Sequence, residues 1–138
     1  MSGSYFSQTP SRGHSPDRAT WTDLESDVSP IDMAEGLVGR PILGESMTVN
    51  VVTLEPHALA AEHAHPEEQI CLVLEGEVDF SVNGEERRLG PGMAVVVPPN
   101  ASHWARAGGS GCRLIDSFHP PRAALVDAVR RSQSSPDR

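Results

Sequence analysis

The segment from Gly76 to Leu89 restricts the fold of this chain more than any other. Residues 77–82 read Glu-Val-Asp-Phe-Ser-Val, so polar and apolar side chains alternate with the period of two that is typical of a strand with one buried face. Asn83 and Gly84 follow, and both residue types accept the positive φ angles of a two-residue hairpin turn. Residues 85–89 then run back. The pattern predicts an antiparallel β-hairpin in the middle of the chain.

The rest of the chain repeats this rhythm of short strands and turns. Strands are predicted at residues 47–54, 69–74, 94–97, 104–107 and 112–118, with turns at Gly90-Pro91-Gly92 and Pro98-Pro99-Asn100. Twelve glycines and twelve prolines among 138 residues suit many short elements. Only residues 122–131, after Pro120-Pro121, look helical. We therefore predict an all-β antiparallel sandwich or barrel with a short C-terminal helix.

The chain length suits one domain. Residues 1–28 are rich in Ser, Pro, Arg, Asp and Thr without apolar periodicity, and we interpret them as a disordered or loosely packed arm that Trp21 and Leu24 pin to the barrel. Residues 29–122 form the predicted barrel, and residues 123–138 the short helix and a frayed tail. No apolar stretch is long enough for a membrane span or a signal peptide, so we expect a cytoplasmic protein.

Composition excludes several chemistries. The chain has no lysine, which excludes Schiff-base and pyridoxal-phosphate enzymes. The net charge is -8, which disfavours nucleic acid as a partner. Cys71 and Cys112 lack the spacing of a metal-binding pair, and we interpret them as reduced, buried thiols. We interpret Glu67 and Glu68 as solvated acids in a turn, with the alternative that Glu67 lies at the rim of the barrel mouth.

The chemically informative stretch is residues 62–69, Glu-His-Ala-His-Pro-Glu-Glu-Gln. Residues two apart in a strand point to the same face, so His63 and His65 both point into the predicted barrel. Gln69 presents its side-chain oxygen from the next strand, and His103 joins them after the Pro98-Pro99-Asn100 turn. Three imidazoles and one amide oxygen, with positions left open, predict one divalent metal ion of a catalytic type, namely zinc, nickel, iron or manganese.

These residues form a composite pattern that resembles the two motifs of the cupin superfamily. The first motif is His-x-His, three or four residues, Glu or Gln, six residues, Gly, which matches residues 62–76. The second is Gly, Pro-x-Gly, two residues, His, which matches residues 90–103. Asn100 stands in place of the usual glycine of this motif, and this departure is mild because Asn tolerates the same left-handed backbone. The resemblance spans residues 40–122 and implies a small cupin barrel, a double-stranded β-helix or jelly roll.

A second cluster lies in residues 116–122, Asp-Ser-Phe-His-Pro-Pro-Arg. Asp116 and Phe118 share a face by strand parity, and Arg122 follows a rigid diproline that lets it fold over the barrel mouth. The alternative is that Asp116 pairs with a neighbouring arginine and that Phe118 is only core. The cluster is similar to that of small cupins that linearise unsaturated uronates, in which the acid, the aromatic and the arginine line the active site. That resemblance implies catalytic roles for Asp116, Phe118 and Arg122.

Three functions follow as hypotheses. The first is a metal-dependent isomerase or lyase that acts on a small anionic, oxygenated substrate, in sugar-acid catabolism or in natural-product biosynthesis. It is favoured because Gln69 is neutral and leaves the ion's charge uncompensated. The second is a metal-dependent dioxygenase, and the third a non-catalytic ligand-binding cupin. We also expect a homodimer that covers exposed sheet edges, with Ile42 and Leu43 at the docked edge, and neither nucleic acid nor membrane as partners.

Overall fold

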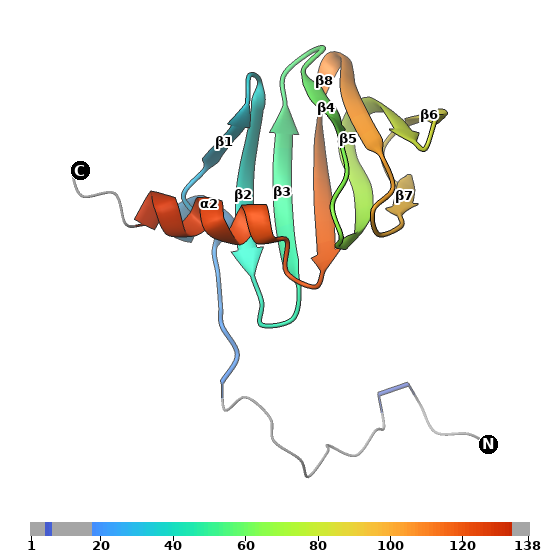
Figure 1. Cartoon of the computed structure of the whole chain (residues 1–138). Helices are drawn as coiled ribbons and strands as arrows, with labels where there is room; N and C mark the ends of the chain where they lie inside the picture. The colour runs from blue at the N-terminus through green and yellow to red at the C-terminus, as the bar shows by residue number, and fades with distance from the viewer. Residues whose placement is uncertain (1–4, 7–17, 134–138) are drawn as a thin grey trace.

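Antiparallel pairing joins eight strands of the computed structural model into one strongly curled sheet (Figure 1). The structure describes residues 5–6 and 18–133. The strands are β1 (Ile31–Ala34), β2 (Leu37–Leu43), β3 (Thr48–Leu54), β4 (Leu59–His63), β5 (Glu68–Val82), β6 (Glu85–Leu89), β7 (Ala94–Val97) and β8 (His103–His119), and the helices are α1 (Leu24–Asp27) and α2 (Ala123–Gln133). The all-β fold with a short C-terminal helix is thus confirmed.

The sheet runs in the order β1-β2-β3-β8-β5-β6, while β4 pairs with β8 and β7 pairs with β5. β8 is therefore the central strand: β5 pairs with it over residues 103–119, whereas β3 pairs with residues 112–118 and β4 with residues 103–106. The inward side chains of β3, β5 and β8 form the core, which includes Val52, Val73, Val78, Cys71 and Leu114. Cys71 and Cys112 are free and buried, as predicted.

The two longest strands were predicted as four short ones. Residues 69–74 and 78–82 lie in the single strand β5, and residues 104–107 and 112–118 lie in β8. The strands bend rather than end at Gly76 and Gly111, whose φ angles are +76° and +77°. A Cβ atom on Gly76 would collide with the carbonyl oxygen of Gly111, so the close approach of the two strands requires glycine there.

The predicted turns are confirmed by their backbone angles. Asn83 and Gly84 have φ angles of 50° and 86° and connect β5 to β6. Asn100 has a φ of 68°, so it adopts the left-handed conformation expected for the residue that replaces the motif glycine. Its amide donates to the carbonyl oxygen of His65 at 2.8 Å. The Asn100 turn therefore connects the two halves of the metal motif.

The outward face of the sheet is unusually apolar. Two neighbouring rows of side chains cross β3, β8, β5 and β7 on this face. The first row is Val49, Ser117, Ile70 and Val96, and the second is Val51, Ile115, Leu72 and Ala94. Ile70 is 45 % exposed and Val96 is 55 % exposed. A solvated sheet face normally carries polar residues, so this surface is suited to association.

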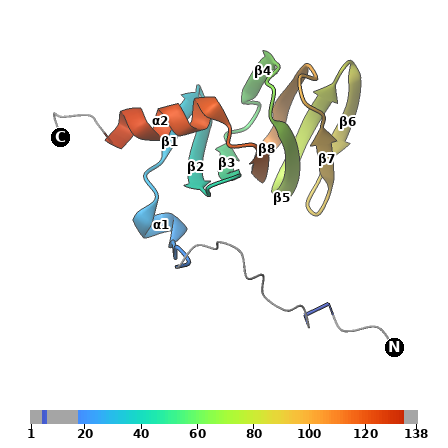
Figure 2. The same cartoon turned by 60° about the horizontal axis from the view of Figure 1, so that its bottom comes forward.

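Helix α2 crosses one side of the barrel beside β1 and β2 (Figure 2). Short helix α1 begins at the N-cap Asp23, and Arg40 donates to the carbonyl oxygens of Leu24 and Val28 at 3.2 and 2.8 Å. Trp21 is 89 % exposed, so the prediction that it pins the arm was wrong, and Arg40 makes the attachment instead. Most of the predicted arm and the tail 134–138 lie outside the described residues. No helix in the described ranges is both long and apolar enough to cross a membrane.

Candidate metal centre

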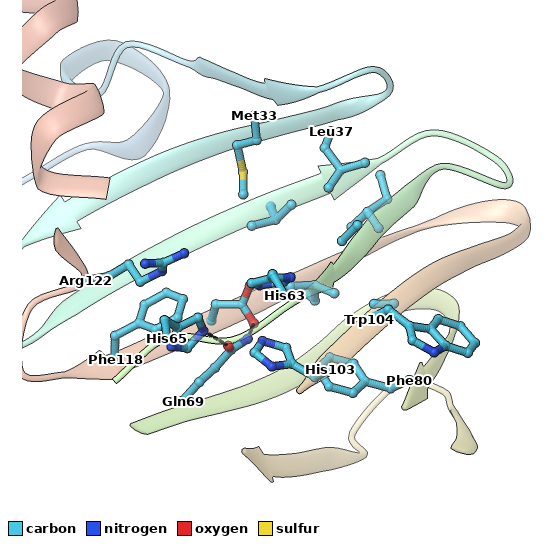
Figure 3. Close-up of a pocket in the computed structure, with 16 residues that line it drawn as sticks. Met33, Leu37, His63, His65, Gln69, Phe80, His103, Trp104, Phe118 and Arg122 are labelled. Atoms are coloured by element: carbon cyan, nitrogen blue, oxygen red, sulfur yellow. Dashed lines mark hydrogen bonds between the residues drawn. The ribbon is translucent and has the colours of Figure 1, made fainter. Parts of the chain in front are cut away.

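Three histidines meet at one end of the barrel (Figure 3). His63 ends β4, His103 begins β8, and the two residues are paired in register, while His65 lies in the loop before β5. One nitrogen of each ring lies within 4.8 Å of a nitrogen of the other two. His65 and His103 are buried and His63 is exposed. The three side chains predicted from the His-x-His and later motifs therefore come together as a group able to hold a metal ion.

The backbone fixes the tautomer of each ring. In every case Nδ1 lies within hydrogen-bonding distance of a carbonyl oxygen two residues away, and the pairs are His63 with Ala61 at 2.7 Å, His65 with Glu67 at 3.0 Å and His103 with Ala101 at 2.8 Å. A carbonyl only accepts, so Nδ1 must carry the proton. Nε2 is then left with a lone pair in all three rings, which is the form that ligates metals.

Gln69 completes the set from β5. Its Nε2 donates to Asp116 Oδ1 at 2.8 Å, which orients the amide so that Oε1 lies 3.1 Å from His65 Nε2. Both of these atoms are acceptors, and the buried Nε2 of His103 has no partner either. Several lone pairs thus converge without a proton between them. This arrangement costs free energy by itself and fits a divalent cation, for which imidazole nitrogen and amide oxygen are suitable ligands.

Burial favours the neutral imidazoles. It lowers the pKa of His65, with Arg122 adding to the effect, and it also lowers the pKa of His103. A neutral ring is ready to bind a cation without first losing a proton. The histidines, with Gln69, therefore fit a metal ion in geometry, tautomer and charge.

A cavity of about 110 Å³ opens beside these ligands. Its walls are mostly apolar, contributed by residues such as Leu37, Val52, Leu54, Phe80 and Leu114. The predicted Asp116, Phe118 and Arg122 all line it, and Figure 3 shows Arg122 and Phe118 on the same side as His65. The structure thus brings the second predicted cluster to the metal ligands. No ion pair joins Asp116 to a neighbouring arginine within the described residues.

Asp116 is placed to hold a proton near neutral pH. Burial raises its pKa to about 6, against the hydrogen bonds with Gln69 and Cys71, which lower it. Phe118 packs its ring edge-on against His65, with the centroids 5.6 Å apart. The cavity therefore combines an acid, an aromatic wall and a guanidinium around the candidate metal ligands.

The structure adds two residues to this site. Glu67 is 3 % exposed, so the prediction of a solvated turn residue was wrong, and it lies instead against Arg122 and Ala123, in line with the alternative position at the barrel mouth. The pKa of Glu67 is lowered overall. Burial raises it, but this is outweighed by hydrogen bonds from the amides of Ala123 and of Glu67 itself and by the charges of Arg122 and His65. Glu67 lies two residues from both His65 and Gln69, and this alternating spacing was the signal in the sequence that could have identified it as inward-facing. Met33 of β1 also lines the cavity, and nothing in the sequence indicated this.

Comparisons with known proteins agree with this architecture. The model of the cupin domain family matches residues 50–118. A curated relative, dimethylsulfoniopropionate lyase DddQ from Ruegeria pomeroyi, is 36% identical over 69 residues, which are 49% of this chain and 34% of that protein. The chain therefore spans about a third of the length of this relative.

Solved structures show the same barrel. An RmlC-like cupin from Shewanella frigidimarina superposes with a TM-score of 0.71 at 26% identity, covering 78% of this chain and 96% of that one. KdgF from Halomonas sp. gives the same TM-score and identity, covering 78% and 99%. TT1209 from Thermus thermophilus is 31% identical with a TM-score of 0.61, covering 64% and 87%.

Proposed function

Since this chain belongs to the cupin family, we propose that it is a metal-dependent enzyme of the isomerase or lyase type that acts on a small anionic, oxygenated substrate. The observation that carries the proposal is the convergence of unprotonated lone pairs from His65, His103 and Gln69 beside a cavity that also holds Asp116 and Arg122. His63 supplies the remaining ligand.

The charge of the cavity supports an anionic substrate. All four candidate ligands are neutral, so the ligand set does not offset the charge of a cation. When bound there, a divalent ion supplies a Lewis acid toward a substrate oxygen. Arg122 adds a guanidinium at the cavity wall, with a geometry suited to a carboxylate.

The relatives support the same chemical class. The lyase DddQ is named for dimethylsulfoniopropionate, which carries a carboxylate together with a sulfonium group. The likeness to KdgF agrees with the resemblance to uronate-linearising cupins, whose substrates are also carboxylates. Proton transfer at carbon or oxygen is common to elimination and to sugar-ring opening, and neither reaction consumes oxygen.

The residues of this chain divide the work as follows. Arg122 binds the substrate carboxylate, and Phe118 packs against its apolar or ring face. Asp116, whose pKa of about 6 allows both protonation states near neutral pH, accepts a proton from the substrate; it returns that proton to another substrate atom in an isomerisation, or releases it to water after an elimination has expelled the leaving group. The apolar walls exclude water and so strengthen these interactions.

The test uses two carboxylate probes, an unsaturated uronate and dimethylsulfoniopropionate, with metal-loaded protein under air and under nitrogen, followed by NMR. We expect turnover of at least one probe at equal rates in both atmospheres. Asp116→Asn should lower kcat by about 100-fold or more with binding largely kept, and Arg122→Ala should mainly raise KM. Oxygen consumption coupled to turnover would favour the dioxygenase, and saturable binding without turnover would favour a ligand-binding role.

A further inference from the structure

Glu67, in the bend before β5, is buried, although its neighbour Glu68, the first residue of β5, is exposed. A carboxylate that is 3 % exposed costs free energy unless charged or hydrogen-bonding partners compensate for the lost water. The groups around Glu67 therefore account for its position, and they belong to two different parts of the barrel mouth.

The first group is the start of helix α2. Glu67 Oε2 accepts a hydrogen bond from the amide of Ala123, the first residue of the helix, at 3.0 Å. Amides in the first turn of a helix lack intrahelical acceptors, and a negative charge there is favourable. Arg122 Nη1 lies 3.7 Å from Oε1 of the same carboxylate. Glu67 thus holds both the helix and the guanidinium at the edge of the cavity.

The second group is the metal ligand His65. Its Nδ1 donates to the Glu67 carbonyl oxygen at 3.0 Å and also lies 3.4 Å from Glu67 Oε1. A carboxylate or carbonyl behind a ligating histidine fixes the ring orientation and increases the basicity of the other nitrogen. The carbonyl oxygen makes the hydrogen bond, whereas Oε1 has no hydrogen-bond partner among the described residues and acts on the His65 N–H and on Arg122 through its charge alone.

We infer that Glu67 is a positioning residue that couples the metal ligand His65 to Arg122 and helix α2. Its backbone carbonyl orients the His65 ring, and its carboxylate, as a nearby negative charge, increases the basicity of Nε2 and attracts Arg122 to the same place. Metal affinity therefore depends on a residue that does not touch the metal. The part concerning Arg122 rests on the proposed function, whereas the part concerning His65 rests on the metal site alone.

The experiment compares three variants of the full-length protein. Glu67→Gln keeps the size of the side chain and an oxygen for the Ala123 amide but removes the charge. Glu67→Ala removes both, and Glu68→Gln makes the same change of charge at the exposed neighbour. The readouts are zinc affinity by competition with a chelator, hydrogen exchange of the peptide that contains Ala123, and thermal unfolding without metal.

We expect Glu67→Gln to weaken zinc binding about tenfold, with exchange at Ala123 and the unfolding midpoint close to those of the wild type. Glu67→Ala should weaken zinc binding at least as much and also accelerate exchange at Ala123, while Glu68→Gln changes neither. If Glu67→Gln fails to fold, Glu67→Asp is measured instead, and it should likewise weaken zinc binding because the shorter side chain withdraws from His65.

Zinc affinity in the Glu67 variants within twofold of that in Glu68→Gln would overturn the inference and leave the metal-dependent function standing. A wild-type protein that binds no zinc, nickel, iron or manganese would instead overturn both. The two failures are therefore distinguishable.

Discussion

Replacing Asp116 by leucine should weaken metal binding, although Asp116 is not itself a proposed ligand. The Asp116 carboxylate accepts from Gln69 Nε2 at 2.8 Å, and this bond keeps Gln69 Oε1 directed at the imidazoles. Leucine offers no acceptor, so the Gln69 amide loses its orientation. A hydrogen bond to a charged group contributes roughly 1.5–3 kcal/mol, which corresponds to a roughly 10- to 150-fold loss of metal affinity if all of it acts through Gln69.

The matched variant is Asp116→Asn, which keeps an oxygen able to accept from Gln69. We expect its zinc affinity to fall less than that of Asp116→Leu, by about 2- to 30-fold, because it retains the roughly 1 kcal/mol of a neutral hydrogen bond and loses only the remaining roughly 0.5–2 kcal/mol. Competition with a chelator measures both variants, and Asp79→Leu, on the same strand as Gln69 but outside the cavity lining, controls for general destabilisation. Wild-type affinity in Asp116→Leu would refute the view that Asp116 orients Gln69 toward the metal.

Three further predictions concern the rest of the barrel. The Cys71 and Cys112 thiols should resist N-ethylmaleimide at pH 8 until the protein unfolds, because burial raises the pKa of both thiols, that of Cys112 to about 11. Rapid labelling of the folded protein, measured by mass spectrometry, would contradict this. Gly76→Ala should lower the free energy of unfolding in urea by at least about 2 kcal/mol. Gly84→Ala, with open space around the residue, should lower it by only about 1 kcal/mol. Equal losses would count against the view that the close approach of Gly76 to Gly111 requires glycine. We propose the homodimer again, but through the outer apolar face rather than the edge at Ile42 and Leu43 that the sequence suggested. Light scattering should show a dimer that Ile70→Asp converts to a monomer, and a monomeric wild type at micromolar concentration would rule the dimer out.

The parts of the fold that the sequence predicts are those set by local chemistry. The hairpin at Asn83-Gly84 and the left-handed Asn100 follow from backbone preferences of single residues, and the structure shows both. The clustering of His63 and His65 was predicted from strand parity, and the structure shows it although β4 ends at His63 and His65 lies in the loop before β5. These features do not depend on distant partners, which is why a pattern of a few residues is sufficient.

The missed features depend on residues far apart in the chain. Gly76 was interpreted as a strand end because glycine usually punctuates strands, but Gly111 across the sheet makes it a bend within β5. Glu67 was interpreted as solvated because it lies in a predicted turn, but the helix amide that it accepts from, that of Ala123, lies 56 positions away. Burial of that kind is set by tertiary packing and has no local signature apart from parity.

The central claim is that His63, His65, His103 and Gln69 hold one divalent metal ion. The most direct measurement is the metal content of protein purified without chelators, by mass spectrometry of the elements, for the wild type and His103→Ala. We predict about one ion per chain in the wild type and its loss in the variant, with the circular dichroism of the barrel retained, since the core is built from apolar residues on other positions of the strands. Equal metal content in the two proteins, or none in a folded wild type, would contradict the assignment.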